Sequence, residues 1–297
     1  MSWSLDPAHV RDRHVLITGA NSGLGFEATR ALATLGATVW MACRNTTKAE
    51  AARDRILGYV PDAKLEMVEL DLASLASVEA AAEDVKGRTD RLDLLLNNAG
   101  LMGTDPTLTE DGFELQVGVN HIGHFALTGR LMPLLEEADA PRVVNHSSMG
   151  HRLTRSYPAV ESLEYYDRWN SYFYSKLANL LFTLELSRRL AAKGSKVITT
   201  AAHPGGSRTE LAQKGSGFTN DVFRFFMPWV TQTADQGVLP LLRAATDKAA
   251  APGAFYGPRW MVFGEPVLET PSQRARDAGE ASNLWSSSVQ WTGVDAV

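Results

Sequence analysis

Tyr172 and Lys176 are the residues whose types and spacing point most directly to chemistry. They lie four apart in Ser171 to Lys193, where apolar side chains recur at helical spacing, so the phenol and the ammonium share one helix face. A free tyrosine has a pKa of about 10, and a neighbouring ammonium lowers that pKa toward neutral pH, where proton transfer is most efficient. Tyr174 is excluded because the residue four further on is Ala178. The pair predicts a tyrosine acid/base that a lysine assists.

A glycine-rich turn near the start of the chain predicts a phosphate-binding site. His14 to Ile17 is a strand candidate, and a helical pattern from Leu24 to Leu35 follows it, with Gly36 as a stop. Glycines let the intervening backbone bend sharply, and the first N–H groups of the helix are free to bind a pyrophosphate. The predicted cofactor-binding residues of this turn are Gly19, Asn21, Ser22, Gly23, Leu24 and Gly25. Taken alone, a turn that binds no ligand is the alternative.

Charged residues follow the second and third predicted strands. Arg44 follows Thr38 to Cys43, and Asp71 follows Lys64 to Leu70. About 20 residues beyond the glycines, an acidic side chain suits the ribose hydroxyl of NAD, whereas an arginine suits the 2′-phosphate of NADP. Arg44 therefore favours NADP. A solvated charge at a strand end and a helix-entry aspartate are the alternative interpretations.

Small and polar residues follow the next two predicted strands. Leu92 to Leu96 leads into Asn97-Asn98-Ala99-Gly100, and Arg142 to Asn145 leads into His146-Ser147-Ser148. Ligands bind at the carboxyl edge of an open parallel sheet, where small residues allow close approach and hydroxyls can donate to a substrate carbonyl. Turn residues without a ligand are the alternative. In this order with Tyr-x-x-x-Lys, the motifs Thr-Gly-x-x-x-Gly-x-Gly and Asn-Asn-Ala-Gly resemble the short-chain dehydrogenase/reductase family.

The resemblance extends from His14 to about Gly257 and implies roles for individual residues. Ser148 would be the catalytic serine, and Asn120, in an Asn-x-x-Gly-x-Phe segment, would order a water for proton relay. A buried capping or packing asparagine is the alternative for Asn120. Lys176 would also hold the ribose hydroxyls. The remaining cofactor contacts that the family implies are Asp71 and Leu72 beside the adenine, Asn98, Ala99 and Gly100, the Pro204-Gly205 turn over the nicotinamide, and Thr209.

Two segments suggest a subgroup and a substrate class. Gly150 to Asn170 has mixed polarity and no clean period, and this insertion resembles retinol-dehydrogenase-like and WW-domain-oxidoreductase-like members of the family. Phe218 to Val230 is rich in aromatic residues and follows a flexible Lys-Gly-Ser-Gly sequence, which favours a lid over an apolar substrate. Shallow contact of this segment with a membrane surface is the alternative.

Composition excludes several classes of function. The net charge of −5 and the isoelectric point of about 5.8 argue against a nucleic-acid partner. The single cysteine, Cys43, cannot form an internal disulfide, and His121 and His124 lack a third ligand, so no metal is assigned. No stretch reaches the roughly 18 apolar residues of a membrane span, and the N-terminus lacks a signal-peptide core. A cytoplasmic protein is expected.

The fold class predicted is a doubly wound α/β domain of the Rossmann type with a mostly parallel sheet. We expect one NAD(P)-binding domain over residues 1–297, with a core of about 12–257 and a C-terminal extension, 258–297, that packs on the body because of its tryptophans. The later elements predicted are helices at Thr46 to Leu57, Gly112 to Ala138 with a break near Gly118, Asp235 to Ala249 and Ala275 to Trp285, and strands at Lys196 to Ala202 and Ala254 to Tyr256.

The function predicted is NADP(H)-dependent hydride transfer, with NAD(H) as the alternative cofactor, to or from the carbonyl or alcohol of a small apolar molecule. Ser148 would polarise the carbonyl, Tyr172 would move the proton, and Lys176 and Asn120 would support Tyr172. A cofactor-sensing protein without turnover is the alternative from another class, although all four catalytic positions are filled. A homo-oligomer remains open.

Overall fold

Apolar runs of strand length form a sheet of eight strands within residues 3–206 and 233–297, which the computed structural model describes. The strands are β1 His14–Thr18, β2 Thr38–Cys43, β3 Lys64–Glu69, β4 Leu94–Asn97, β5 Arg142–His146, β6 Ile198–Ala202, β7 Ala254–Pro258 and β8 Pro266–Glu269. Seven of these strands are parallel, and β8 pairs antiparallel with β7. The predicted fold class is confirmed.

Helices connect the parallel strands. The main ones are α1 Gly23–Thr34, α2 Thr46–Tyr59, α3 Leu75–Arg88, α5 Gly123–Glu137, α6 Arg168–Ala192, α9 Leu239–Thr246 and α10 Ala278–Thr292. Shorter pieces are η1 Pro7–His9, α4 Leu115–Val117, the π-helical turn η2 Gly118–Ile122, η3 Met149–Leu153, α8 Ala234–Gly237 and η6 Arg274–Arg276. None of the helices in the described ranges combines the length and apolarity needed to span a membrane.

The strand order is β3-β2-β1-β4-β5-β6-β7-β8. The order therefore reverses between β1 and β4, which lie side by side as parallel neighbours. In such sheets the crevice beyond the carboxyl ends of the strands at this reversal is where ligands bind. The glycine-rich turn after β1 and the Asn-Asn-Ala-Gly segment after β4 consequently flank one crevice.

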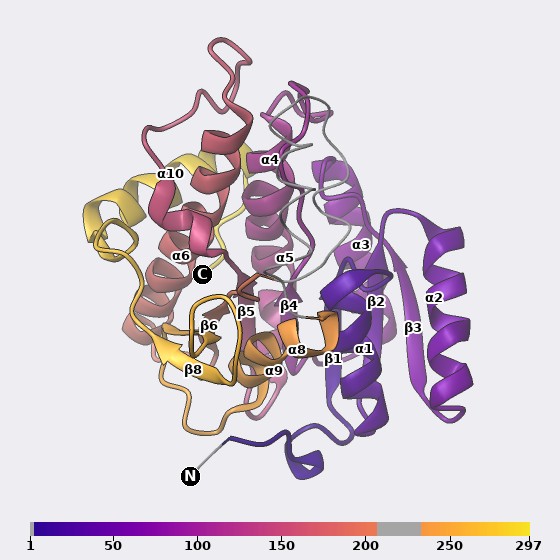
Figure 1. The fold of residues 1–297 in the computed structure, drawn as a ribbon. Coiled ribbons are helices and arrows are strands. Elements are labelled where there is room, and N and C mark those ends of the chain that lie inside the picture. The colour runs from indigo at the N-terminus through magenta and orange to yellow at the C-terminus, as the bar shows by residue number, and fades with distance from the viewer. Residues whose placement is uncertain (1–2, 207–232) are drawn as a thin grey trace.

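Two apolar cores lie on opposite faces of the sheet, because successive side chains of a strand alternate between its faces. Val15 and Ile17 share one core with α1, α2 and α9, whereas Leu16, between them, joins the core with α3, α5 and α6. Figure 1 shows the helices on both faces of the sheet, with α6 and α10 together on one side. Continuous apolar runs, rather than alternating ones, are the sequence signature of strands covered on both faces.

The C-terminal residues pack against this body. Trp285 in α10 is buried against Phe125 of α5, at 5.1 Å between ring centroids, and against Phe182 of α6. Ala296 is fully buried beside Gly129, where a Cβ atom would lie 2.5 Å from Val294. The helix begins at Ala278, later than predicted, and extends to Thr292. β8 was not predicted from the sequence.

Two long predicted helices are interrupted. The region Gly112 to Ala138 contains α4, which starts after the Glu114 cap, then the π-helical turn η2 and α5, so the predicted break near Gly118 is present. A Cβ atom at Gly118 would lie 2.4 Å from the Thr109 side chain, so the η2 backbone packs closely on the preceding loop. The region Asp235 to Ala249 divides into α8 and α9 at Val238, just before the proline at the start of α9.

Candidate active site

The glycine-rich turn is a tight cradle at the carboxyl end of β1. Gly19 and Gly23 have φ angles of +66° and +52°, in the left-handed region that favours glycine. A Cβ atom at Gly25 would lie 2.2 Å from the Gly19 carbonyl oxygen and 2.7 Å from Asn98 Nδ2. The first turn of α1 therefore packs directly on the end of β1. Any side chain at Gly25 would push the two apart.

The first turn of α1 suits a phosphate group. Ser22 stands at the N-cap with extended backbone, but its side chain makes no capping hydrogen bond. The first N–H groups of the helix therefore lack the side-chain acceptor that often satisfies them. Unpaired N–H groups and the helix dipole together attract an anion. The cradle thus fits the pyrophosphate of a dinucleotide, and all six residues predicted for this contact lie on it, from Gly19 to Gly25.

Arg44 and Asp71 lie together at the ends of β2 and β3. An Arg44 guanidinium nitrogen lies 3.7 Å from an Asp71 carboxylate oxygen, and the Arg44 side chain is 63% exposed. The other Asp71 oxygen accepts the Ala73 N–H at 2.9 Å, which fixes the turn. Leu72 is buried below Gly123 of α5. The exposed pair suits the adenosine end of a dinucleotide lying across this edge.

Asn98 and Ala99 are tied to the end of β1 through Thr18. Their two N–H groups donate to the Thr18 hydroxyl at 3.0 and 2.9 Å, and Asn98 Nδ2 donates to the Thr18 carbonyl at 2.8 Å. Asn98 and Ala99 therefore tie the end of β4 to the end of β1. A Cβ atom at Gly100 would lie 3.3 Å from Lys176 Nζ, so the Asn-Asn-Ala-Gly segment borders α6, the helix that carries Lys176.

The predicted catalytic side chains Ser148, Tyr172 and Lys176 come together. The Ser148 hydroxyl lies close enough to the Tyr172 phenol to lower the pKa of that phenol. Lys176 Nζ lies 5.8 Å from the centre of the Tyr172 ring and 3.3 Å from the His146 carbonyl, to which it donates. Ser148 follows β5, whereas the other two side chains project from α6, which begins at Arg168 after its Asp167 cap.

Burial dominates the pKa values of this cluster. It raises the pKa of Tyr172 above its ordinary value, while the Ser148 hydrogen bond acts in the opposite direction. Burial lowers the pKa of Lys176 to about 8. The lysine-driven fall in the Tyr172 pKa that the sequence suggested is not found: burial raises this pKa, and the opposing contribution comes from Ser148. The phenol consequently stays protonated at neutral pH, ready to donate.

The Asn120 side chain is fully engaged within the protein. Its Oδ1 accepts the Leu101 N–H at 2.7 Å, and its Nδ2 donates to the Leu101 carbonyl and to Ser175 Oγ at 2.9 and 2.8 Å. The Ser175 hydroxyl in turn donates to the Tyr172 carbonyl at 2.7 Å. Asn120 thus joins the predicted site, but its side chain acts as a brace. The Asn120 backbone carbonyl lies 3.1 Å from His124 Nδ1.

A buried histidine and a glutamate hold the Pro204-Gly205 turn. His203 Nδ1 accepts the Gly205 N–H at 3.1 Å, and its Nε2 lies 2.9 Å from a Glu269 carboxylate oxygen of β8. A Cβ atom at Gly257 would clash with both side chains, at 2.1 Å. Sequence reasoning missed His203 and Glu269, since neither belongs to a motif. The predicted contact Thr209 and the predicted lid Phe218 to Val230 lie outside the described residues.

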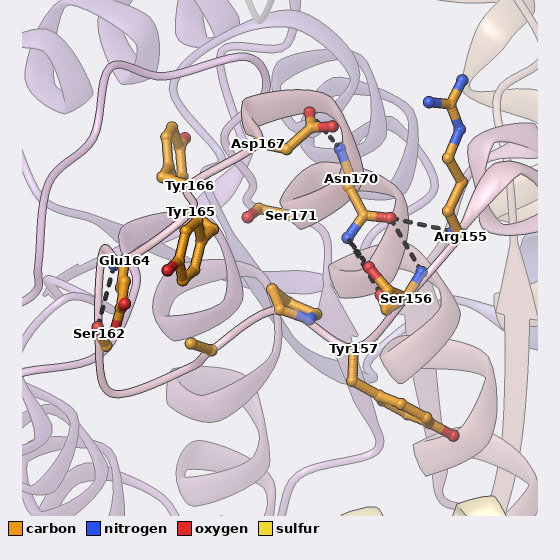
Figure 2. Close-up of a pocket in the computed structure, with 12 residues that line it drawn as sticks. Arg155, Ser156, Tyr157, Ser162, Glu164, Tyr165, Tyr166, Asp167, Asn170 and Ser171 are labelled. Atoms are coloured by element: carbon orange, nitrogen blue, oxygen red, sulfur yellow. Dashed lines mark hydrogen bonds between the residues drawn. The ribbon is translucent and has the colours of Figure 1, made fainter.

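The insertion predicted between β5 and α6 lacks regular structure beyond η3. A cavity of about 440 Å³ lies within it, and Figure 2 shows Asn170 on one side of this cavity. Asn170 Oδ1 accepts the N–H groups of Arg155 and Ser156 at 3.0 and 3.4 Å. Asp167 accepts the N–H of Asn170 at 3.1 Å. The insertion is therefore anchored on the helix turn that precedes Tyr172.

His121 and His124 make separate contacts. His121 Nε2 lies 2.9 Å from Ser288 Oγ of α10, whereas His124 Nε2 lies 2.9 Å from Thr18 Oγ. Burial lowers their pKa values to about 3 and about 4, so both rings are neutral. In the described part of the chain, no group of three or more His, Cys, Asp or Glu side chains could hold a metal ion.

The chain is similar in sequence to several known proteins. A family model described as short chain dehydrogenase matches residues 13–217. Human retinol dehydrogenase 12 is 38% identical over 281 residues, which cover 94% of this chain and 86% of the relative. Retinol dehydrogenase 11 of Mus musculus is 43% identical, with the same shares of the two chains covered.

The chain is also similar to several solved structures. An uncharacterized protein from Mycobacterium paratuberculosis is 41% identical, with a TM-score of 0.78 and full coverage of both chains. A short chain dehydrogenase from Escherichia coli, crystallised with NADPH, is 26% identical, with a TM-score of 0.68 over 85% of this chain and 98% of its own. A similar protein from Shigella flexneri, 25% identical with a TM-score of 0.66 over 85% of this chain and 99% of its own, was crystallised with NADP.

Proposed function

The chain belongs to the short-chain dehydrogenase family, whose members transfer a hydride between a nicotinamide cofactor and a carbonyl or alcohol, and from this premise we propose an NADP(H)-dependent enzyme for apolar substrates. The observation that carries the proposal is the contact of the Ser148 hydroxyl with the Tyr172 phenol, with Lys176 on the next turn of α6. Lys176 borders Gly100 in the segment after β4, beside the reversal of strand order.

The proposed mechanism divides the work among four residues. The nicotinamide, when bound, supplies the hydride or accepts it. Ser148 donates a hydrogen bond to the substrate oxygen. Tyr172 gives that oxygen its proton as the phenol during reduction, and takes the proton back as the phenolate during oxidation. Lys176 stabilises the phenolate that remains, and its ammonium holds the ribose. The Asn120 backbone carbonyl holds the water through which the phenol regains a proton.

The preference for NADP(H) rests on Arg44. Its guanidinium is exposed at the end of β2, where the adenosine ribose of a dinucleotide would lie, and a planar guanidinium binds phosphate through two parallel hydrogen bonds. Two of the similar structures were crystallised with NADP or NADPH, which supports this choice. Asp71, beside it, would otherwise favour a ribose hydroxyl.

Replacing Arg44 with alanine is expected to weaken NADPH binding by about 10- to 100-fold, since a hydrogen bond to a charged group contributes about 1.5–3 kcal/mol. The affinity for NADH should change little. Nicotinamide fluorescence titrations of the purified variants measure both constants. Arg53→Ala is the matched control, because Arg53 is a surface arginine of α2 that pairs with its neighbour Asp54. Equal losses for NADPH and NADH in Arg44→Ala would refute the role.

The proposed substrate is an apolar aldehyde, ketone or alcohol of retinoid-like or lipid-like character. The printed names of several relatives specify retinol. Exposed apolar side chains also lie beside the Pro204-Gly205 turn: the Val262 carbonyl accepts the Gly206 N–H at 2.9 Å, and Trp260 and Phe263 on the same hairpin are 64% and 56% exposed. Apolar groups at this position favour an apolar substrate entrance.

Cofactor oxidation across carbonyls graded from small and polar to long and apolar tests the proposal. We expect NADPH, rather than NADH, to be consumed with the long apolar aldehydes and not with sugars. Equal turnover of sugars and long apolar carbonyls would refute the substrate class, and turnover with NADH alone would refute the cofactor preference. NADPH binding without oxidation by any carbonyl would favour the sensing protein, which the filled catalytic positions argue against.

A further inference from the structure

His124 connects two parts of the site that no sequence motif joins. It lies in the first turn of α5 and is 2% exposed. Its Nδ1 is 3.1 Å from the backbone carbonyl of Asn120, and its Nε2 is 2.9 Å from the Thr18 hydroxyl at the end of β1. The ring therefore bridges the π-helical turn η2 and the start of the glycine-rich cradle.

The partners of the ring determine where its proton sits. The Asn120 carbonyl can only accept, so His124 Nδ1 must carry the hydrogen. The Thr18 oxygen already accepts two N–H groups, from Asn98 and Ala99, which use both of its lone pairs. The Thr18 hydroxyl must then donate to His124 Nε2; its other acceptor, the Leu96 carbonyl, is more distant, at 3.4 Å. The arrangement allows only a neutral ring with hydrogen on Nδ1.

We propose that His124 is a positioning residue that, through Thr18, sets the cofactor cradle and the Asn120 carbonyl at their working separation. The proposal rests on the proposed function, which assigns Asn98 and Ala99 to the cofactor and the Asn120 carbonyl to proton relay. One polar chain runs from these N–H groups through Thr18 and His124 to that carbonyl. Because every donor and acceptor along it is matched, no member can turn without leaving a buried polar group unpaired.

The lowered His124 pKa, about 4, supports this assignment. A second hydrogen on Nε2 would face the Thr18 oxygen, which has no lone pair to offer. The ammonium of Lys176 also disfavours a charge on this ring. The His124 ring consequently keeps one orientation and one protonation state near neutral pH, as a positioning residue must.

Two conservative variants separate the two halves of the bridge. In His124→Gln the amide oxygen lies near the place of Nε2 and can still accept from Thr18, while the donor to Asn120 is lost. In His124→Asn the amide nitrogen lies near the place of Nδ1 and can still donate to Asn120, while the acceptor for Thr18 is lost. We expect His124→Gln to retain NADPH affinity and lose about tenfold in kcat, and His124→Asn to lose about tenfold in NADPH affinity.

His121→Phe is the matched control. His121 is an equally buried histidine one turn away, but its Nε2 contacts Ser288 of α10 and not the site. We expect a lower melting temperature with unchanged NADPH affinity and kcat. If His121→Phe lowers kcat and NADPH affinity as His124→Gln and His124→Asn do, the effects arise from helix packing and the proposal is wrong. It is also wrong if both His124 variants match the wild-type protein.

The tautomer gives a test that needs neither substrate nor turnover. Nitrogen-15 NMR of wild-type protein with labelled imidazole rings should show His124 with hydrogen on Nδ1, the less common neutral form. This form should persist from about pH 6 to about pH 8, a range that includes the pKa of free histidine. Thr18→Val, which removes the hydroxyl, should shift the Nε2 resonance. A ring with hydrogen on Nε2, or a charged ring, would overturn the proposal. Failure to oxidise NADPH with any carbonyl would instead refute the proposed function and leave the tautomer result standing.

Discussion

Replacing Tyr172 with phenylalanine is expected to reduce kcat by about a thousandfold, within the 10²- to 10⁴-fold range typical of losing a general acid or base. The variant retains the ring that lies beside Lys176 and Phe173 and loses only the hydroxyl that contacts Ser148. Packing of α6 should therefore be preserved. Steady-state NADPH oxidation with an apolar aldehyde measures the loss, and circular dichroism checks that the protein is folded.

Tyr174→Phe is the natural control for this experiment. Tyr174 lies two residues further along α6, is 5% exposed and packs against Tyr157 at 5.5 Å between ring centroids. Burial raises its pKa, as for Tyr172, but it has no lysine one turn away. We expect Tyr174→Phe to keep its turnover. Near-normal kcat in Tyr172→Phe, with the protein folded, would refute the proposed mechanism.

Replacing Gly25 with alanine is expected to abolish NADPH binding and to lower the free energy of unfolding by about 1–3 kcal/mol, the usual cost of overpacking. The new methyl group would lie 2.2 Å from the Gly19 carbonyl oxygen and 2.7 Å from Asn98 Nδ2. Backbone atoms cannot yield as a flexible side chain can, so α1 must move away from β1 and the phosphate cradle opens. Calorimetric titration with NADPH and urea unfolding measure the two effects.

Gly58→Ala shows what the same substitution does elsewhere. Gly58 lies on the exposed side of α2, and a Cβ atom there meets nothing within 4 Å. Because alanine is the better helix former, this variant should gain about 0.5–1 kcal/mol of stability and bind NADPH normally. NADPH affinity in Gly25→Ala equal to that of Gly58→Ala would contradict the assignment of the cradle.

The sequence predicted the parts of this protein that depend on local pattern. Apolar runs bounded by turn residues located seven of the eight strands of the described sheet, and motif order brought Ser148, Tyr172 and Lys176 together correctly. β8 escaped prediction because its burial is mixed and one face is open, so Pro266 to Glu269 carries no continuous apolar run. Elements covered on both faces leave a strong pattern, and edge elements do not.

Residues that act through distant partners were beyond sequence reasoning. Asn120 was assigned to a relay, with a packing asparagine as the alternative, but the sequence could not name the partners of its side chain, Leu101 and Ser175, which no spacing rule connects to it. The Tyr172 pKa was expected to fall and is instead raised, because the depth of burial is a property of the assembled fold. Side-chain contacts between residues far apart in the sequence can be identified only once the strand order of the folded sheet is known.

The bond between His203 and Glu269 has a consequence for the order in which the protein matures on the ribosome. The glutamate is 66 residues later in the chain than the histidine, and it lies on the last strand of the sheet. A nascent chain that has released β1 to β6 can already form the phosphate cradle, but it leaves the His203 ring without its carboxylate and the turn after β6 without that support. The glycine-rich cradle is thus complete earlier in synthesis than the support of the Pro204-Gly205 turn.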